Sequence, residues 1–502
     1  MATPSALPFP PQTQYINNRA HHDQTSETFL TYNPSTGAPL AQVYTATPSD
    51  IDLAIKASLA AFPSWAATPP VERSRILLKA VQLLRERNDE IARVETLDTG
   101  KAWVETSTVD VATGADVLEY FAGLGMGMGE GKTVQLRKKA WVYTKKVPLG
   151  VCVGIGAWNY PIQIALWKCA PALAAGNTFI FKPSEVTPLT ATLLAQILTT
   201  AGLPPGVFQL LHGASTVGSA LISDPRISKV SFTGQPSTGI TVYRTASQNL
   251  LPVTLELGGK SPFIVFPDAD IDRAVDCCMT ANFYSSGQVC TNGTRVFVHE
   301  TICAEFTRQL KAKVEEAVRI GDPLDPGTNF GPVVSRQHYE KVVSYINHGI
   351  REDKATLVIG GPEKPETLPE ELKSGFYVNP TIFTDCTDGM KIVREEIFGP
   401  VACILSFSSK EEVIRRANDT VLGLAAGVFT RDLDTACEVM DEVNAGICWV
   451  NSWGESPAQM PVGGWGLSGL GFENGSEALA QFTKGKSVLV ENGAVEPAFS
   501  KL

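Results

Sequence analysis

The strongest constraint on the fold is an alternation of short apolar runs with helix-like segments, which begins at Val151. Helix-like stretches such as 189–200, closed by Gly202 and Pro204, separate these runs. Strand, helix and strand at this spacing predict a parallel sheet with helices on both faces, and ligands of such sheets bind at the carboxyl ends of the strands. The five predicted strands are 151–155, 179–181, 207–211, 230–232 and 253–257.

A second alternating series starts at Pro262 and runs to about residue 450, which predicts a second α/β domain. Before the first sheet, the apolar spacing predicts a short helix at 51–62 and one long helix from Pro70 to Gly100. Two β-type runs, 133–147 and 486–491, fit neither series and are interpreted as arms that pair outside the main sheets.

Composition excludes several classes of protein. The 502 residues contain 52 acidic and 42 basic side chains, a net charge of −10 without a basic block, so nucleic acid and membrane surfaces are poor partners. No apolar stretch reaches the ~18 residues of a spanning helix, and the first residues lack the pattern of a signal peptide. Ten cysteines without a paired CxxC predict neither a disulfide scaffold nor a metal site. We therefore expect a soluble protein of a reducing compartment.

Two segments carry residues suited to chemistry. Cys290 lies between small, flexible residues in 287–293 and outside any helical apolar stripe, which suits a reactive thiol; the alternative is a structural cysteine. Glu256 ends a predicted strand and precedes Gly258 and Gly259, which leave room for water or substrate beside a general base. Its alternative interpretation is an ordinary solvated carboxylate.

Taken together, these segments resemble the aldehyde dehydrogenase superfamily, and the resemblance extends along nearly the whole chain. The matching motifs are ELGGKSP at 256–262, GQVC at 287–290, AWNYP at 157–161, KPSE at 182–185, FTG at 232–234 and EEIFGP at 395–400. The resemblance implies an α/β fold with an NAD-binding domain (1–132 and 149–257), a catalytic domain (258–460) and an oligomerisation arm (133–148 and 483–497).

The resemblance also implies catalytic roles. Cys290 attacks the aldehyde to give a thiohemiacetal, and the Asn159 amide with the Cys290 backbone N–H holds the oxyanion. Hydride transfer leaves a thioester, which is hydrolysed by water that Glu256 activates. Lys168 and Glu473 match a proton route, although Phe472 stands where the family usually has arginine.

The implied cofactor is NAD+, with NADP+ weaker because the Glu185 carboxylate repels a 2′-phosphate. Gln235 and Pro236 depart from the family's usual pyrophosphate-binding turn, but a helix start still follows them. The residues assigned to the cofactor are Ile155, Gly156, Trp158, Lys182, Ser184, Glu185, Phe232, Thr233, Gly234, Glu396 and Phe398.

Tyr160, Trp167 and Trp453 fall on segments that line the aldehyde entrance in the family, and three aromatic rings can surround a quaternary ammonium group. For Trp167 the alternative is a place in the core. The segments 154–165 and 449–457 are similar to betaine aldehyde dehydrogenases, so the expected substrate is betaine aldehyde and the expected product glycine betaine. The 4-trimethylaminobutyraldehyde and ω-aminoaldehyde branch is the alternative.

Three further expectations complete the interpretation. A catalytically idle relative is disfavoured because Cys290, Glu256, Asn159 and Lys182 are all present, and Glu256 favours hydrolysis over transfer to coenzyme A. The arms predict a homo-oligomer, either a dimer or a tetramer. The terminal tripeptide Ser500-Lys501-Leu502 is a peroxisomal address, which predicts binding to the import receptor and a peroxisomal location.

Overall fold

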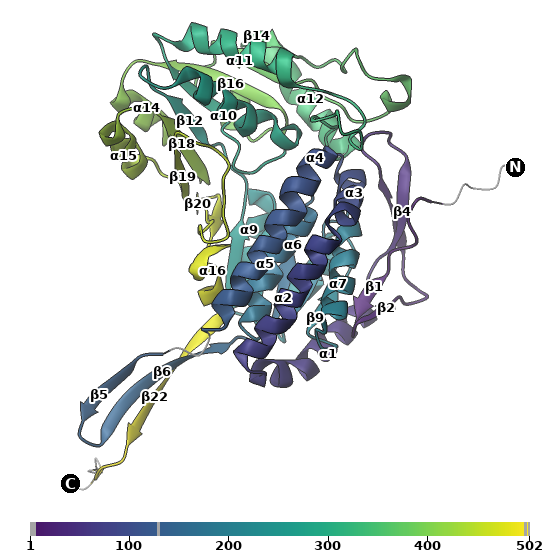
Figure 1. Ribbon diagram of the computed structural model, residues 1–502, viewed down its shortest axis with the longest axis vertical. Coiled ribbons are helices and arrows are strands. Elements are labelled where there is room, and N and C mark those ends of the chain that lie inside the picture. Colours follow the sequence, from purple (N-terminus) through teal and green to yellow (C-terminus); the bar gives the residue numbers. More distant parts are fainter. Residues whose placement is uncertain (1–6, 128–130, 496–498, 500–502) are drawn as a thin grey trace, which may run out of the picture.

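The computed structural model describes residues 7–127, 131–495 and 499. It has two lobes and a narrow projection that extends away from one of them (Figure 1). The predicted tripeptide 500–502 and the last residues of the predicted arm lie outside the described residues. The peroxisomal address therefore stays a prediction.

An eight-stranded sheet forms the centre of the first lobe, in the order β2-β1-β9-β8-β7-β10-β11-β21. Its five central strands run parallel, as the apolar runs predict, and are β7 (Val151–Ile155), β8 (Thr178–Lys182), β9 (Phe208–Leu210), β10 (Lys229–Thr233) and β11 (Val253–Glu256). Antiparallel strands extend the sheet at both edges: β1 (Gln14–Ile16) and β2 (Arg19–His21) on one side, and β21 (Gly469–Leu470) on the other. Segments from both ends of the chain thus complete this sheet.

Helices cover both faces of the first sheet (Figure 1). Those that pack directly on the sheet are α1 (Pro48–Ala67), α6 (Pro161–Ala174), α7 (Leu189–Ala201), α8 (Ser215–Ser223) and α9 (Pro236–Ser247). The others pack against these helices or against one another: α2 (Pro70–Glu86), α3 (Asn88–Thr99), α4 (Trp103–Glu105), the π-helix η1 (Thr106–Asp110) and α5 (Val111–Gly125).

The prediction of one long helix from Pro70 to Gly100 is wrong, because the helix breaks at Arg87. Arg87 has φ −103° and ψ 15°, and it separates α2 from α3. Leu84 and Ile91 on either side of the break are both fully buried. The bend at Arg87 therefore lets each helix place its own apolar face on the core, which one straight helix cannot do over this length.

The second lobe contains a seven-stranded sheet in the order β14-β15-β16-β13-β12-β18-β19. Its strands are β12 (Pro262–Val265), β13 (Arg295–His299), β14 (Thr356–Ile359), β15 (Thr381–Thr384), β16 (Val401–Phe407), β18 (Ala425–Phe429) and β19 (Ile447–Val450). Its helices are α10 (Ile271–Phe283), η2 (Tyr284–Gly287), α11 (Cys303–Ala317), α12 (Arg336–Arg351), η3 (Glu370–Leu372), α13 (Lys391–Arg394), α14 (Lys410–Ala417) and α15 (Leu433–Glu442). All pairings in this sheet except that of β14 are parallel.

The projection is a three-stranded antiparallel sheet of β5 (Thr133–Arg137), β6 (Ala140–Pro148) and β22 (Thr483–Glu491), in the order β22-β6-β5. It unites the two β-type runs that the sequence left outside both domains. The remaining elements are the hairpin β3 (Thr28–Tyr32) and β4 (Pro39–Tyr44), the pair β17 (Leu422–Gly423) and β20 (Trp465–Gly466), and α16 (Gly475–Gln481). Among the described helices, none is both long enough and apolar enough to cross a membrane.

Candidate active site

The parallel register of the first sheet brings the predicted site residues to one edge. Ile155 pairs with Lys182 on the neighbouring strand, and Thr233 pairs with Glu256. These four residues end β7, β8, β10 and β11. Because parallel strands end at the same edge, segments that are far apart in the sequence meet there.

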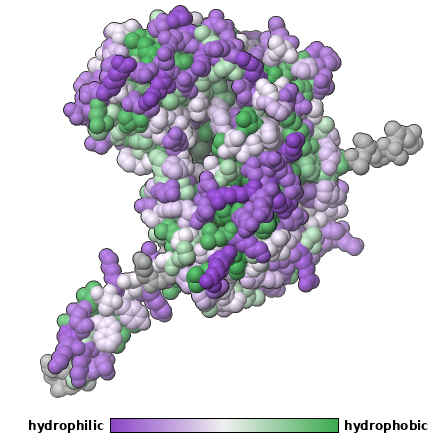
Figure 2. Space-filling model, in the orientation of Figure 1, coloured by the Kyte–Doolittle hydropathy of each residue, from purple (hydrophilic) through white to green (hydrophobic). Residues whose placement is uncertain are grey.

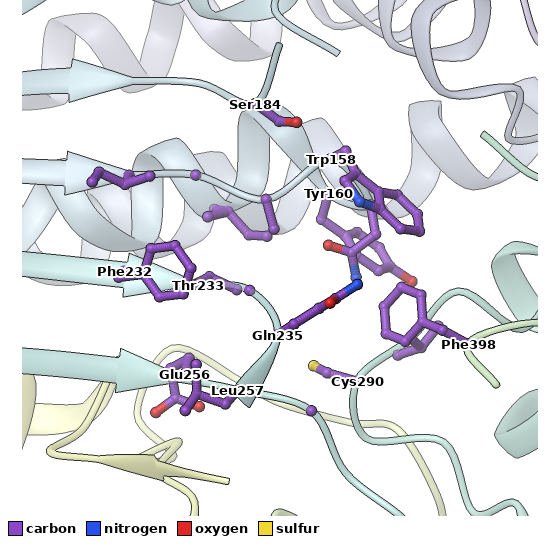
Figure 3. A pocket seen from close by; sticks show the side chains of 18 of the residues that line it. Trp158, Tyr160, Ser184, Phe232, Thr233, Gln235, Glu256, Leu257, Cys290 and Phe398 are labelled. Carbon is purple, nitrogen blue, oxygen red and sulfur yellow. The ribbon is translucent and has the colours of Figure 1, made fainter. Parts of the chain in front are cut away.

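A cavity of about 1090 Å³ opens at this edge and continues towards the second lobe. Figure 2 shows the recess between the two lobes, and Figure 3 shows strand ends with Thr233 and Glu256 on one side and the loops with Cys290 and Phe398 on the other. Every predicted site residue lines this cavity except Lys168, which is fully buried behind it. The structure thus gathers the predicted residues in one place, while the role of each remains a prediction.

Cys290 lies on a loop after η2 and is half-buried, with its sulfur directed into the cavity (Figure 3). Burial, together with the carboxyl groups of Glu256 and Glu396, raises the pKa of Cys290 to about 12. In this environment the thiol holds its proton at neutral pH, so attack on a carbonyl requires a base or a nearby positive charge.

Gly258 and Gly259, which follow β11, allow the Cys290 loop to approach the end of this strand closely. A Cβ on Gly259 would lie only 2.7 Å from the Cys290 carbonyl oxygen, and one on Gly258 would lie 2.2 Å from Glu396 Oε2. Glu396 accepts a hydrogen bond from the Gly259 N–H at 2.9 Å. The absence of side chains at Gly258 and Gly259 therefore lets the turn after β11, the Cys290 loop and the segment that carries Glu396 pack closely at the cavity.

Asn159 lies in the loop between β7 and α6 and is 7 % exposed. Its Nδ2 donates a hydrogen bond to the Gln288 carbonyl oxygen at 3.0 Å, two residues before Cys290. A primary amide has two N–H donors, so one remains for an oxyanion formed at the cysteine. The bond to Gln288 also orients the amide relative to the Cys290 loop.

Glu256 is buried, and its Oε1 has no hydrogen-bond partner among the described residues. Desolvation raises the pKa of Glu256, and Glu473 raises it further, whereas Lys168 lowers it. Figure 3 shows the Glu256 side chain at the strand end, where its carboxylate does not reach the Cys290 sulfur. For the predicted role of Glu256 in activating water at Cys290, its side chain must turn towards the thiol.

Lys168 and Glu473 form a buried ion pair behind Glu256, and the proton route predicted for them stays a prediction. Ser231 Oγ completes the cluster by donating to Glu473 Oε1 at 2.9 Å and accepting from Lys168 Nζ at 3.1 Å. Phe472, which takes the place of the family's usual arginine, is 40 % exposed and does not take part in this cluster.

The arrangement of the predicted cofactor residues fits a dinucleotide. Lys182 Nζ lies 3.2 Å from Glu185 Oε2, so a carboxylate and an ammonium group face the cavity together and can bind ribose hydroxyls. Thr233 Oγ1 is buried without a hydrogen-bond partner in the described part of the chain, just before the start of α9, where an anion is favoured. At the far end, the Trp158 ring meets Phe398 edge-on with ring centres 5.2 Å apart.

The three predicted substrate aromatics differ in their surroundings. Trp453 is 6 % exposed and packs against Phe263 and Trp449, with ring centres 5.3 and 4.9 Å away. Trp167, in contrast, is only half-buried. Trp167 packs against the core with part of its surface, whereas Trp453 is the more buried of the two because the loop that carries it folds back over the second sheet.

Sequence reasoning missed two residues of the aldehyde side of the cavity. Tyr284 lines it, and its hydroxyl is buried without a hydrogen-bond partner in the described residues. Glu455 lines it as an exposed carboxylate next to the Trp453 loop. An aromatic residue just before the Cys290 loop was a usable signal for Tyr284, whereas nothing in the sequence pattern distinguished Glu455 from other surface carboxylates.

The comparison with known proteins decides the family. The model of the aldehyde dehydrogenase family matches residues 21–488. The chain belongs to the aldehyde dehydrogenase family.

Solved aldehyde dehydrogenases share the fold over almost the whole chain. Betaine aldehyde dehydrogenase from Staphylococcus aureus in complex with NAD+ is 34 % identical, covers 97 % of this chain and 96 % of its own, and has a TM-score of 0.93. An aldehyde dehydrogenase from Bacillus cereus in complex with NAD+ is 38 % identical over 96 % of this chain and 97 % of its own, with a TM-score of 0.92. A putative aldehyde dehydrogenase from Burkholderia cenocepacia is 36 % identical, with coverage of 97 % and 99 % and a TM-score of 0.94.

Proposed function

We propose that this aldehyde dehydrogenase oxidises betaine aldehyde to glycine betaine with NAD+ as cofactor. The observation that carries the proposal is one cavity in which Cys290, Asn159 and Glu256 meet a group of aromatic side chains. The first three are the nucleophile, an oxyanion donor and a base, and the aromatic group suits a cationic head. NAD+ is supported by the complexes of the Staphylococcus aureus and Bacillus cereus relatives and by the Lys182–Glu185 pair.

In this proposal the chain's own residues act in order. The Cys290 thiol releases its proton to solvent water in the cavity, the thiolate attacks the aldehyde carbon, and the free N–H of Asn159 stabilises the oxyanion. NAD+ supplies the hydride acceptor when it is bound. The thioester left on Cys290 is then attacked by a water whose proton Glu256 takes, which releases the carboxylic acid and restores the thiol.

The cationic substrate is supported by the composition of the aldehyde side of the cavity. Tyr160, Trp167, Tyr284 and Trp453 bring four aromatic rings to it, and Glu455 adds a negative charge. Aromatic faces attract a quaternary ammonium group by ~1–2 kcal/mol per good contact when it is desolvated. The similarity to the Staphylococcus aureus betaine aldehyde dehydrogenase, which extends over almost the whole length of both chains, also supports this substrate class.

The test compares betaine aldehyde with 3,3-dimethylbutanal, a neutral aldehyde of the same shape. We expect kcat/KM with NAD+ to be higher for betaine aldehyde, and Trp167→Leu to reduce it roughly 5- to 30-fold while the neutral aldehyde loses much less. Cys290→Ala serves as the blank. Equal losses for both aldehydes would leave Trp167 as an apolar wall and remove the support for a cationic substrate.

The second candidate is 4-trimethylaminobutyraldehyde or another ω-aminoaldehyde, because these share the cationic head and differ in length. A panel of these aldehydes, measured with NAD+ and with NADP+, separates the two candidates by their order of kcat/KM.

We also propose that the chain forms a homo-oligomer through the projecting sheet. Val134, Leu136 and Leu489 are each at least half exposed on this sheet, and a second subunit would cover them. The molar mass in solution, with and without deletion of 132–147, tests this proposal.

A further inference from the structure

The turn that leads into the Cys290 loop has an unusual backbone. Ser285 and Ser286 both adopt the left-handed conformation, with φ of 51° and 52°. Residues other than glycine rarely occupy this region, and two in succession persist only where their surroundings hold them. The turn lies a few residues before the nucleophile, so whatever holds it also affects the position of the thiol.

A buried carboxylate from the other lobe holds this turn. Glu105, at the end of α4, accepts a hydrogen bond from the Ser285 N–H at 3.1 Å and from Ser285 Oγ at 3.2 Å. Glu105 is 5 % exposed and Ser285 is 1 % exposed. Because the Ser285 hydroxyl donates to Glu105, it accepts from the Tyr160 hydroxyl, which lies 2.9 Å away. The chain of bonds thus runs from Tyr160 through Ser285 to Glu105.

The same turn is linked to the reacting residues. The Ser285 carbonyl accepts a hydrogen bond from Gln288 Nε2 at 3.1 Å, and the Gln288 carbonyl accepts from Asn159 Nδ2 at 3.0 Å. Cys290 follows two residues later. A change at Ser285 is therefore transmitted both to the oxyanion donor and to the nucleophile.

We propose that Glu105 is a positioning residue that fixes the Ser285 turn and thereby places Cys290 and Asn159 for attack on the aldehyde. Glu105 does not line the cavity, so it acts through Ser285 rather than on the substrate. This role is independent of which aldehyde the enzyme oxidises. It adds to the family's nucleophile, base and oxyanion donor a residue from the first lobe that the sequence did not indicate.

The surroundings suggest which substitutions keep the geometry. Lys101 and Asp110 form a buried ion pair whose charges act on Glu105, and substitutions of Glu105 change neither of these two residues. Glu105→Gln retains one oxygen that can accept from the Ser285 N–H and gains an N–H that can donate to Ser285 Oγ. Glu105→Ala loses both bonds. Glu105→Gln keeps the hydrogen bonds but not the carboxyl group, whereas Glu105→Ala keeps neither. A difference in rate between the two variants therefore measures the effect of the hydrogen bonds.

The experiment measures single-turnover formation of NADH by the full-length enzyme, in excess over aldehyde and with saturating NAD+. Betaine aldehyde and 3,3-dimethylbutanal are used in parallel. We expect Glu105→Ala to slow this rate about 10- to 100-fold, which is the effect of a displacement of about 1 Å at a reacting group. We expect the same factor for both aldehydes and little change in the Kd for NAD+, with Glu105→Gln restoring the rate to within about threefold of wild type.

Asp98→Asn is the matched control, because Asp98 is also fully buried and accepts one backbone N–H, from Leu189 at 2.9 Å. Its single-turnover rate should stay near that of wild type. If Glu105→Ala fails to fold, Ser285→Ala tests the proposal instead, and we expect its single-turnover rate to fall about three- to tenfold. The proposal is overturned if the rate survives Glu105→Ala or Ser285→Ala, or if Glu105→Gln loses as much as Glu105→Ala. A wild-type enzyme inactive on betaine aldehyde but active on the neutral aldehyde would contradict only the proposed substrate.

Discussion

Lys101 Nζ lies 3.7 Å from the centre of the Tyr160 ring. The ammonium group therefore already occupies one face of an aromatic ring that was expected to bind a cationic substrate, and only the other face remains for the cavity. Lys101 in turn pairs with Asp110, and both side chains are almost completely buried. The Lys101–Asp110 ion pair thus supports Tyr160 from behind, and neither of its side chains lines the cavity.

Breaking this ion pair should be strongly destabilising. Lys101→Met leaves the Asp110 carboxylate buried without its partner, which costs about 3–5 kcal/mol, whereas replacing both partners costs much less. We expect a large fall in Tm for Lys101→Met and substantial recovery in the double variant Lys101→Met/Asp110→Asn. Thermal unfolding followed by circular dichroism measures both, and a double variant no more stable than the single one would contradict the expectation.

Glu105 should make stability depend on pH. Burial raises the pKa of Glu105 from 4.5 to about 7. Between pH 4.5 and pH 7 the folded protein keeps a proton on Glu105 that the unfolded chain has already released. The contribution of Glu105 to the free energy of unfolding is therefore complete below pH 4.5 and is lost as the pH rises through 7. The loss amounts to roughly 3 kcal/mol. We expect Tm to fall less between pH 5 and pH 8 in Glu105→Gln than in the wild type. Curves of Tm against pH that run parallel for the two proteins would contradict this expectation.

Deacylation should depend on the ionisation of Glu256. Its raised pKa means that the basic form increases as pH rises, so steady-state kcat should rise with pH through that value. We expect Glu256→Gln to lower steady-state kcat about 10²- to 10⁴-fold and to flatten this profile, while the first turnover of NADH persists. Stopped-flow traces from pH 6 to pH 9 measure both phases. An unchanged steady rate would remove Glu256 from the hydrolytic step.

Cofactor preference should respond to Glu185, whose side chain is 45 % exposed beside Lys182. Glu185→Gln removes a negative charge that opposes a 2′-phosphate, so kcat/KM for NADP+ relative to NAD+ should increase about tenfold. The exposed Glu119, which pairs with Arg85 away from the cavity, supplies the control variant Glu119→Gln. An unchanged cofactor ratio in Glu185→Gln would show that this carboxylate does not face the ribose.

Trp453 should matter more for stability than for selectivity. Its ring is buried against Phe263 and Trp449, and a Cβ on Gly427 would lie 2.6 Å from it. Truncation of such a ring costs about 3–5 kcal/mol. We therefore expect Trp453→Ala to lower Tm much more than Trp167→Leu does. Similar Tm values for the two variants would contradict the packing inferred for Trp453.

The sequence by itself determined the regular parts of this protein. Short apolar runs predicted the central strands β7 to β11, and the motifs around Cys290, Glu256 and Glu396 indicated the family that the comparison then established. Such features are local: a buried parallel strand must be apolar, and a nucleophile with its flanking glycines occupies a few consecutive positions.

Only the tertiary structure decided how distant segments meet. β1 and β21 carry too few residues for a recognisable period, yet they extend the first sheet by pairing with β9 and β11. The burial of Trp453, the contact of Lys101 with Tyr160 and the bonds from Glu105 to Ser285 likewise join residues that are remote in the chain. Whether such a side chain is buried or paired depends on which distant residues fold next to it, and the local sequence does not contain that information.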